Sequence, residues 1–81
     1  MDSPDRVVAR VQKNSRDFIC IMMRHFKGAD FIDLRLFTEN GDHEQIATKT
    51  GITIKPELLG KVIEGLRQAE ALAVAEGLIN A

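Results

Sequence analysis

The hydrophobic pattern of the chain changes its period at Pro56, and this change sets the order of its secondary structure. Upstream of Pro56, apolar residues form short runs or alternate with polar ones, which is typical of β-strands. Downstream, they recur at helical spacing as far as Gly77, a residue type that often ends helices. Proline also suits the first turn of a helix, where its missing N–H has no hydrogen bond to lose. The pattern therefore predicts an α+β domain with a four-stranded antiparallel sheet followed by one C-terminal helix.

Four segments upstream of Pro56 have strand character. They span residues 7–13, 18–26, 31–38 and 44–54. Turn residues separate them at Asn14-Ser15, at Gly28 and at Asn40-Gly41-Asp42, and the last of these is the strongest hairpin signal in the chain. Gly51 interrupts the fourth segment and predicts a bulge or bend.

Two glycines, Gly60 and Gly65, lie within the predicted helix. Each weakens a helix by about 1 kcal/mol relative to alanine. A helix that contains both is expected where another backbone approaches closely, for example across a dimer axis.

The chain has 81 residues, enough for one small domain. A domain of this size buries only about 60% of its unfolded surface and usually needs a disulfide, a metal or a partner subunit. The single cysteine excludes an internal disulfide, and His25 and His43 are not spaced as zinc ligands. We therefore expect a homodimer whose folded domain covers residues 6–77, with a disordered N-terminus at 1–5 and a short tail at 78–81.

The chain has the features of an intracellular protein. Its longest unbroken apolar run, residues 18–23, is far shorter than the roughly 20 residues that span a bilayer. The first five residues are polar and acidic, unlike a signal or transit peptide. Together with the lone Cys20, these features predict a cytoplasmic protein, or a nuclear one in a eukaryote.

Charge is unevenly distributed along the chain. The net charge is −1, which by itself argues against a nucleic-acid-binding protein. Residues 6–35, however, carry seven basic and three acidic side chains, whereas two basic and four acidic side chains lie from Pro56 onward. A basic first half joined to an acidic helix indicates a polyanionic partner.

The sequence contains no recognisable enzymatic motif. It lacks a glycine-rich phosphate loop, paired histidines at helical spacing and a Gly-x-Ser-x-Gly turn. Cys20 lies in an apolar run and is expected to be a buried structural thiol. Asp42, His43 and Glu44 follow a hairpin glycine and are expected in a solvated loop. We therefore predict a protein that is not an enzyme and has neither a cofactor nor a metal site.

The second and third predicted strands combine cations with aromatic rings. Arg24 and Phe26 share one face of a strand, and Asp33, Arg35 and Phe37 share one face of the next. If these strands pair, guanidinium groups and rings lie side by side, which is what single-stranded nucleic acid requires for its phosphates and bases. In the alternative interpretation, the two phenylalanines belong to the core, and Asp33 and Arg35 form a pair on a solvated sheet.

Three short motifs resemble the transcriptional positive-cofactor-four family, which is the single-stranded-DNA-binding domain of a general coactivator, and in particular its short bacterial members. The motifs are His25-Phe26-Lys27-Gly28, Phe31-Ile32-Asp33-Leu34-Arg35 and the run from Lys49 to Glu57, in the order and spacing of the family. The resemblance covers about residues 24–66. It implies a homodimer of curved four-stranded sheets backed by helices, with channels across the sheets for two antiparallel single strands.

The resemblance also implies which side chains bind DNA. The candidates are Arg24, Phe26, Lys27, Arg35, Phe37 and Lys49. The cations would contact phosphates and the two rings would stack on bases. We expect Asp33 to orient Arg35 instead of meeting DNA, because an anion that faces phosphates would repel them. The chain departs from the family in three places. Leu36-Phe37-Thr38 keeps only one of the aromatic residues that are usual after the strand arginine, and Thr50 and Ala29-Asp30 stand where basic residues are usual. These differences predict weaker and strongly salt-dependent binding.

The leading hypothesis is that a homodimer binds single-stranded DNA in a sequence-tolerant way. It would act as a transcriptional coactivator or regulator, with the transcription machinery as a further partner, or it would act in DNA maintenance. The near-neutral charge favours a second hypothesis, a dimeric protein-interaction module that binds DNA weakly and uses the acidic helix face at Glu57, Glu64 and Glu70. Single-stranded RNA is a third candidate ligand, because no residue is recognisable as a reader of the 2′-hydroxyl.

Overall fold

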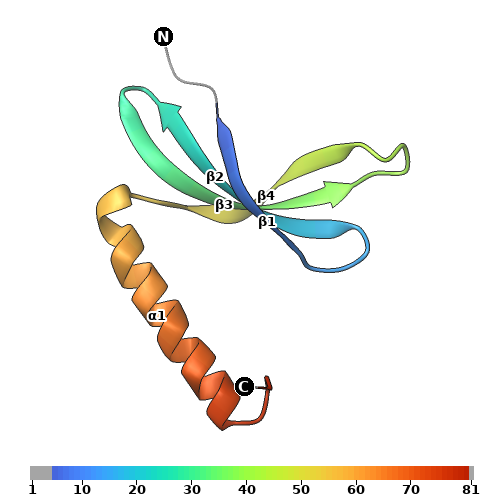
Figure 1. Ribbon diagram of the computed structural model, residues 1–81. Helices are drawn as coiled ribbons and strands as arrows, with labels where there is room; N and C mark the ends of the chain where they lie inside the picture. The colour runs from blue at the N-terminus through green and yellow to red at the C-terminus, as the bar shows by residue number, and fades with distance from the viewer. Residues whose placement is uncertain (1–4, 81) are drawn as a thin grey trace.

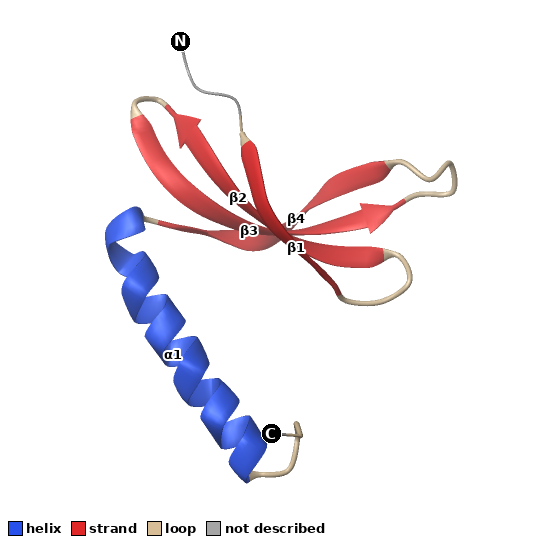
Figure 2. Ribbon diagram, in the orientation of Figure 1, coloured by secondary structure: helices blue, strands red, loops and turns tan. Residues whose placement is uncertain are grey.

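The computed structural model describes residues 5–80 (Figure 1). Four antiparallel strands form one open sheet in the order β1-β2-β3-β4, and a single helix follows (Figure 2). The elements are β1 (Arg6–Gln12), β2 (Asp17–Phe26), β3 (Ala29–Glu39), β4 (Gln45–Ile54) and α1 (Pro56–Ala75). The predicted fold class is confirmed. The predicted disordered segment, residues 1–5, lies outside the described residues apart from Asp5.

The turn between β2 and β3 is tighter than the sequence pattern predicted. Lys27 and Gly28 both have positive φ angles, 51° and 79°, so these two residues reverse the chain and Phe26 pairs directly with Ala29. Turns with two left-handed residues match the twist of antiparallel strands. For this reason β3 begins at Ala29, two residues before the predicted start.

The helix α1 begins at Pro56, as predicted, and ends two residues before Gly77. Gly77 has a φ angle of 75°. Its N–H donates to the carbonyl oxygen of Val74 at 3.0 Å, and the N–H of Leu78 donates to that of Ala73 at 2.8 Å. This pair of bonds satisfies the last helical carbonyl groups and turns the chain away from the axis. No helix within residues 5–80 is long and apolar enough to cross a membrane.

The pairing of the strands gives the sheet two chemically different faces. One face, which we call the arginine face, carries Arg10, Phe18, Cys20, Met22, Arg24, Phe26, Phe31, Asp33, Arg35 and Phe37. The opposite face, which we call the helix face, carries Ile21, Met23, Ile32, Leu34 and Ile54, and the first half of α1 lies over it across an apolar groove. A register shift of one residue would exchange the two sets. The turns therefore decide which side chains each face displays.

A bulge in β4 lies opposite β3. Arg35 pairs with Gly51 and Phe37 pairs with Ala47, so β4 has two more residues than β3 in this interval. The irregularity predicted at Gly51 is thus confirmed. A Cβ at Gly51 would lie 2.5 Å from the carbonyl oxygen of Leu34 and 3.1 Å from the guanidinium carbon of Arg35. A glycine is needed because the backbone of β3 and the Arg35 side chain occupy this space.

The protomer buries few side chains. Among the described residues, the buried ones are Phe18, Cys20, Met22, Ile32, Asp33 and Ile54, and none belongs to α1. The helix runs away from the sheet along its length (Figure 1). The radius of gyration is 15.1 Å, whereas a compact domain of this length has about 12 Å. The protomer is therefore open, and apolar side chains such as Leu66 and Leu72 of α1 remain exposed.

The tight approach at Gly51 predicts that Gly51→Ala lowers the free energy of unfolding by about 1–3 kcal/mol, because the added methyl group forces the backbone of β3 and β4 apart. Urea denaturation at a fixed protein concentration measures this change. Gly41→Ala is the control, since a Cβ at Gly41 has no neighbour within 4 Å, and its effect should stay within about 0.5 kcal/mol. Equal effects of the two substitutions would contradict the steric role of Gly51.

Candidate nucleic-acid interface

Two arginines from neighbouring strands converge on one buried carboxylate at the centre of the arginine face. Asp33 of β3 has 0% of its surface exposed. Its Oδ2 lies 3.0 Å from Nη1 of Arg24 on β2, and its Oδ1 lies 3.0 Å from Nη2 of Arg35 on its own strand. A buried carboxylate is costly unless its oxygens accept hydrogen bonds, and the two guanidinium groups supply them. The contact with Arg35 matches the expectation for Asp33, whereas the contact with Arg24 was not predicted.

The bulge in β4 holds the guanidinium group of Arg35 from a second side. Its Nη1 donates to the carbonyl oxygen of Thr48 at 3.3 Å, and the side chain passes over Gly51. Only 20% of the Arg35 side chain is exposed. Arg35 therefore serves mainly to link β3 to β4, and only a small part of its side chain is accessible to a ligand.

Arg24 is more accessible, with 38% of its side chain exposed. Its Nη1 binds Asp33, its Nε donates to Oδ2 of Asp5 at 3.1 Å, and its guanidinium carbon lies 5.7 Å from the centre of the Phe31 ring. The hydrogen bond to Asp33 raises the pKa of Arg24 above its ordinary value, although partial burial opposes this change. Arg24 can thus bind a second anion while it remains attached to Asp33, as its contact with Asp5 demonstrates.

The β2–β3 turn presents an aromatic ring together with a lysine. Phe26 is 58% exposed, and Nζ of Lys27 lies 5.4 Å from the centre of its ring. Phe26 is therefore not a core residue, which was the alternative interpretation for both phenylalanines. Its ring is accessible for stacking on a base, and the neighbouring ammonium group is placed to meet a phosphate.

Phe37 lies toward the other end of the β2–β3 hairpin and has a different environment. Its ring stacks on Phe18, with 5.3 Å between the ring centres, and it packs against the buried cluster of Phe18, Cys20 and Met22. The core interpretation therefore describes Phe37 better than Phe26. The ring is half-buried, so only its outer part is accessible to a base.

Lys49 lies in the β4 bulge and is exposed. Because the bulge adds two residues and not one, the side chains of β4 keep the same alternation between the two faces of the sheet before and after it. Oγ1 of the preceding Thr48 donates to the carbonyl oxygen of Leu36 at 2.8 Å, which fixes the bulge to β3. Because the carbonyl oxygen of Thr48 also holds Arg35, the bulge places the Lys49 backbone close to that arginine.

Two further residues of the arginine face were not among the predicted DNA-binding residues, Arg10 and Phe31. The guanidinium carbon of Arg10 lies 5.4 Å from the centre of the Phe18 ring, and Arg10 pairs with Cys20. The turn at Asn14 contained the signal for this placement, because a hairpin turn fixes which residues of its two strands oppose each other. By the same reasoning, the β2–β3 turn places Phe31 opposite Arg24 of β2.

Other polar groups of residues 5–80 form no comparable site. Nδ1 of His25 lies 2.6 Å from Oδ1 of Asp30, and Nδ1 of His43 lies 2.8 Å from Oε1 of Glu39. No set of three or more His, Cys, Asp or Glu side chains in this part of the chain is arranged to hold a metal ion. Cys20 is buried, as the sequence predicted.

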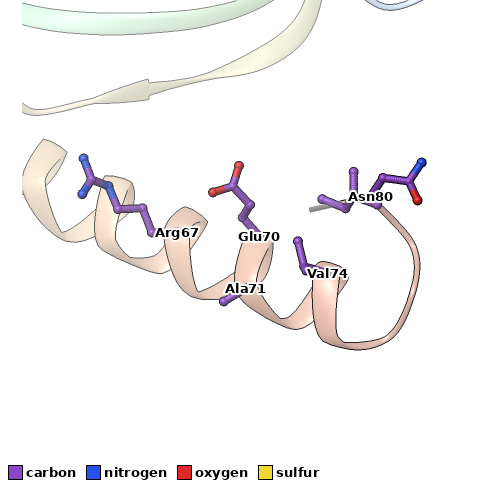
Figure 3. Close-up of a pocket in the computed structure, with 6 residues that line it drawn as sticks. Arg67, Glu70, Ala71, Val74 and Asn80 are labelled. Carbon is purple, nitrogen blue, oxygen red and sulfur yellow. The ribbon is translucent and has the colours of Figure 1, made fainter.

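A hollow lies beside the C-terminal end of α1 (Figure 3). Arg67, Glu70 and Val74 line it from the helix, and Asn80 lines it from the segment that turns back after the helix (Figure 3). Its lining carries charges of both signs and contains no aromatic ring. The arginine face is therefore the better candidate for binding nucleic acid.

The comparisons with known proteins agree with this fold. The family model described as Transcriptional Coactivator p15 (PC4) matches residues 14–65. The orthorhombic crystal structure of BPSL1147, a PC4 homolog from Burkholderia pseudomallei K96243, is 37% identical, covers 84% of this chain and 92% of its own, and has a TM-score of 0.78. The tetragonal form is 37% identical, with coverages of 83% and 98% and a TM-score of 0.77. No curated protein matches the chain. The resemblance found in the sequence is confirmed, and the chain belongs to the PC4 family.

Proposed function

We propose that the chain binds single-stranded DNA as a homodimer, without sequence preference, and acts in transcription as a coactivator or regulator. The observation that carries this proposal is the arginine face of β2 and β3. At the turn it has the exposed ring of Phe26 beside Lys27, and further along it has Arg24 and Arg35 on a shared carboxylate. Membership of a family described as a transcriptional coactivator supports the proposed role.

The arrangement of these groups favours an extended single strand. From Phe26 to the stacked ring of Phe18, β2 runs for about 26 Å at roughly 3.3 Å per residue. A strand laid along this path meets Lys27 first and then Arg24 and Arg35, so its phosphates follow the cations. Its bases remain free to stack on Phe26. A duplex is a poorer ligand, because its base faces are already stacked inside the helix.

We propose that the second copy binds to α1 and the helix face of the sheet. A groove of about 280 Å³ between them has an entirely apolar lining that includes Ile21, Ile32 and Leu66. Leu66 is 60% exposed in the protomer. Apart from the helix backbone and its chain neighbours, a Cβ at Gly60 or Gly65 would meet no atom of residues 5–80 within 4 Å, so no packing contact of these residues explains the two glycines. Burial of this surface in a dimer supplies the apolar burial that a chain of 81 residues lacks.

Lys27→Ala tests the phosphate contacts. We expect it to weaken binding of labelled single strands of different sequence, oligo-dT among them, by a similar factor. It should also lower the slope of log K against log salt by about 0.7, the value for one phosphate on a single strand. Fluorescence anisotropy at several salt concentrations measures both quantities. Lys61→Ala removes the same charge from the exposed face of α1 and should leave the slope unchanged. If the unmodified protein fails to bind at about 50 mM salt, single-strand binding is rejected and the protein-interaction alternative is favoured.

Phe26→Ala tests base stacking. Loss of one stacking ring should weaken oligo-dT binding by about 1–3 kcal/mol while the salt slope stays the same, because no cation is removed. Ile46→Ala is the control, since Ile46 is also an exposed apolar residue but lies on the strand β4, outside the arginine face. An unchanged affinity of Phe26→Ala in a protein that binds DNA would exclude this ring from the interface.

Leu66→Glu tests the dimer. A charge placed in the apolar groove should shift the protein from dimer to monomer in sedimentation-velocity experiments, because an unpaired buried carboxylate opposes association. Gln68→Glu adds the same charge to an exposed position of the same helix and should leave the dimer intact. A dimer that tolerates Leu66→Glu would place the subunit contact elsewhere.

A further inference from the structure

Asp33 is the single charged residue among residues 5–80 that is fully buried. Its exposure of 0% means that its carboxylate cannot meet DNA directly. Both of its oxygens are nevertheless occupied by guanidinium groups, from Arg24 on one strand and from Arg35 on the next. Nε of Arg35 also approaches Oδ2 at 3.4 Å. One carboxylate thus connects the two arginines of the proposed DNA-binding face.

Stability alone does not account for a fully buried carboxylate between two partly exposed arginines. Replacing such a cluster by apolar side chains of similar volume is often neutral or stabilising, because the charges lose their hydration when they are buried. The neighbouring positions of this face already carry buried apolar groups, Phe18, Cys20 and Met22. An apolar residue at position 33 would therefore extend the existing core. The carboxylate is better explained by what it does to the arginines.

We propose that Asp33 is a positioning residue for DNA binding, and this inference rests on the proposed function. It holds the guanidinium groups of Arg24 and Arg35 in one orientation before DNA arrives. Free arginine side chains lose much rotamer freedom when they bind a phosphate, and an arginine that is already fixed loses less. Asp5 illustrates the result: its carboxylate binds Nε of Arg24 while Nη1 of the same group stays on Asp33.

Asp33→Asn separates positioning from simple electrostatics. The substitution removes a negative charge from the binding face, and this change alone would strengthen DNA binding. Positioning predicts the opposite result. We expect oligo-dT affinity to fall about tenfold, because two arginines must then be ordered on binding, and we expect the salt slope not to fall, because both arginines still meet phosphates in the bound state.

Asp42→Asn is the matched control, because it removes the same charge from an exposed hairpin residue. The affinity of Asp42→Asn for oligo-dT should equal that of the unmodified protein or exceed it slightly. If Asp33→Asn binds as tightly as Asp42→Asn, the positioning role is overturned. A reduced affinity would also overturn it if the circular dichroism of Asp33→Asn showed partial unfolding, since unfolded protein lowers the active fraction without any change in the arginines.

A second measurement needs neither DNA nor a variant. Heteronuclear NOE values of the arginine Nε–H groups in the unmodified protein report how rigid each guanidinium group is on the ps–ns timescale. Arg24 and Arg35 should be as rigid as the backbone of β3, whereas Arg67 on the exposed surface of α1 should be mobile. Equal mobility of the three groups would overturn the inference. If the protein does not bind oligo-dT, the proposed function fails, and the NOE comparison still decides whether the two arginines are ordered before DNA arrives.

Discussion

The ion pairs of Asp33 with Arg24 and Arg35 are the interaction on which the arginine face depends. Two guanidinium groups on adjacent strands repel each other unless an anion lies between them. The buried carboxylate brings them together and leaves the cluster with one net positive charge. Because this carboxylate is buried, its negative charge is not exposed to an approaching phosphate. A chain with a net charge of −1 can in this way present a locally cationic surface.

The backbone of β4 is shaped to accept this cluster. The bulge before Gly51 brings the carbonyl oxygen of Thr48 to Nη1 of Arg35, and the absence of a side chain at Gly51 leaves room for the guanidinium group. An irregularity that weakens strand pairing thus adds a hydrogen bond to a mostly buried cation. The opposite face of the same sheet has no such cluster. It is apolar and open beneath α1, which suits the proposed division of the sheet into a DNA-binding face and a subunit-binding face.

Local features of the sequence predicted the elements and much of the site. The alternation before Pro56, the turn residues and Gly51 each act over a few residues, so the order of four strands and one helix could be predicted without any tertiary contact. Alternation also placed Arg24 and Phe26 on one face of a strand. The family resemblance was carried by three short motifs and required no structure. The start of β3 was wrong by two residues, because the left-handed conformation of Lys27 cannot be inferred from its residue type.

The sequence by itself determined the elements, their order and the residues available to each face of the sheet, because these properties follow from chain geometry and nearest neighbours. Only the tertiary structure decided which of those residues are accessible. Phe26 and Phe37 have the same residue type and lie on the same face, yet one ring is exposed at a turn and the other stacks on Phe18. Likewise, only the register of β2 and β3 revealed that one carboxylate serves two arginines. Exposure and charge pairing depend on side chains that come from different strands, and no local pattern contains that information.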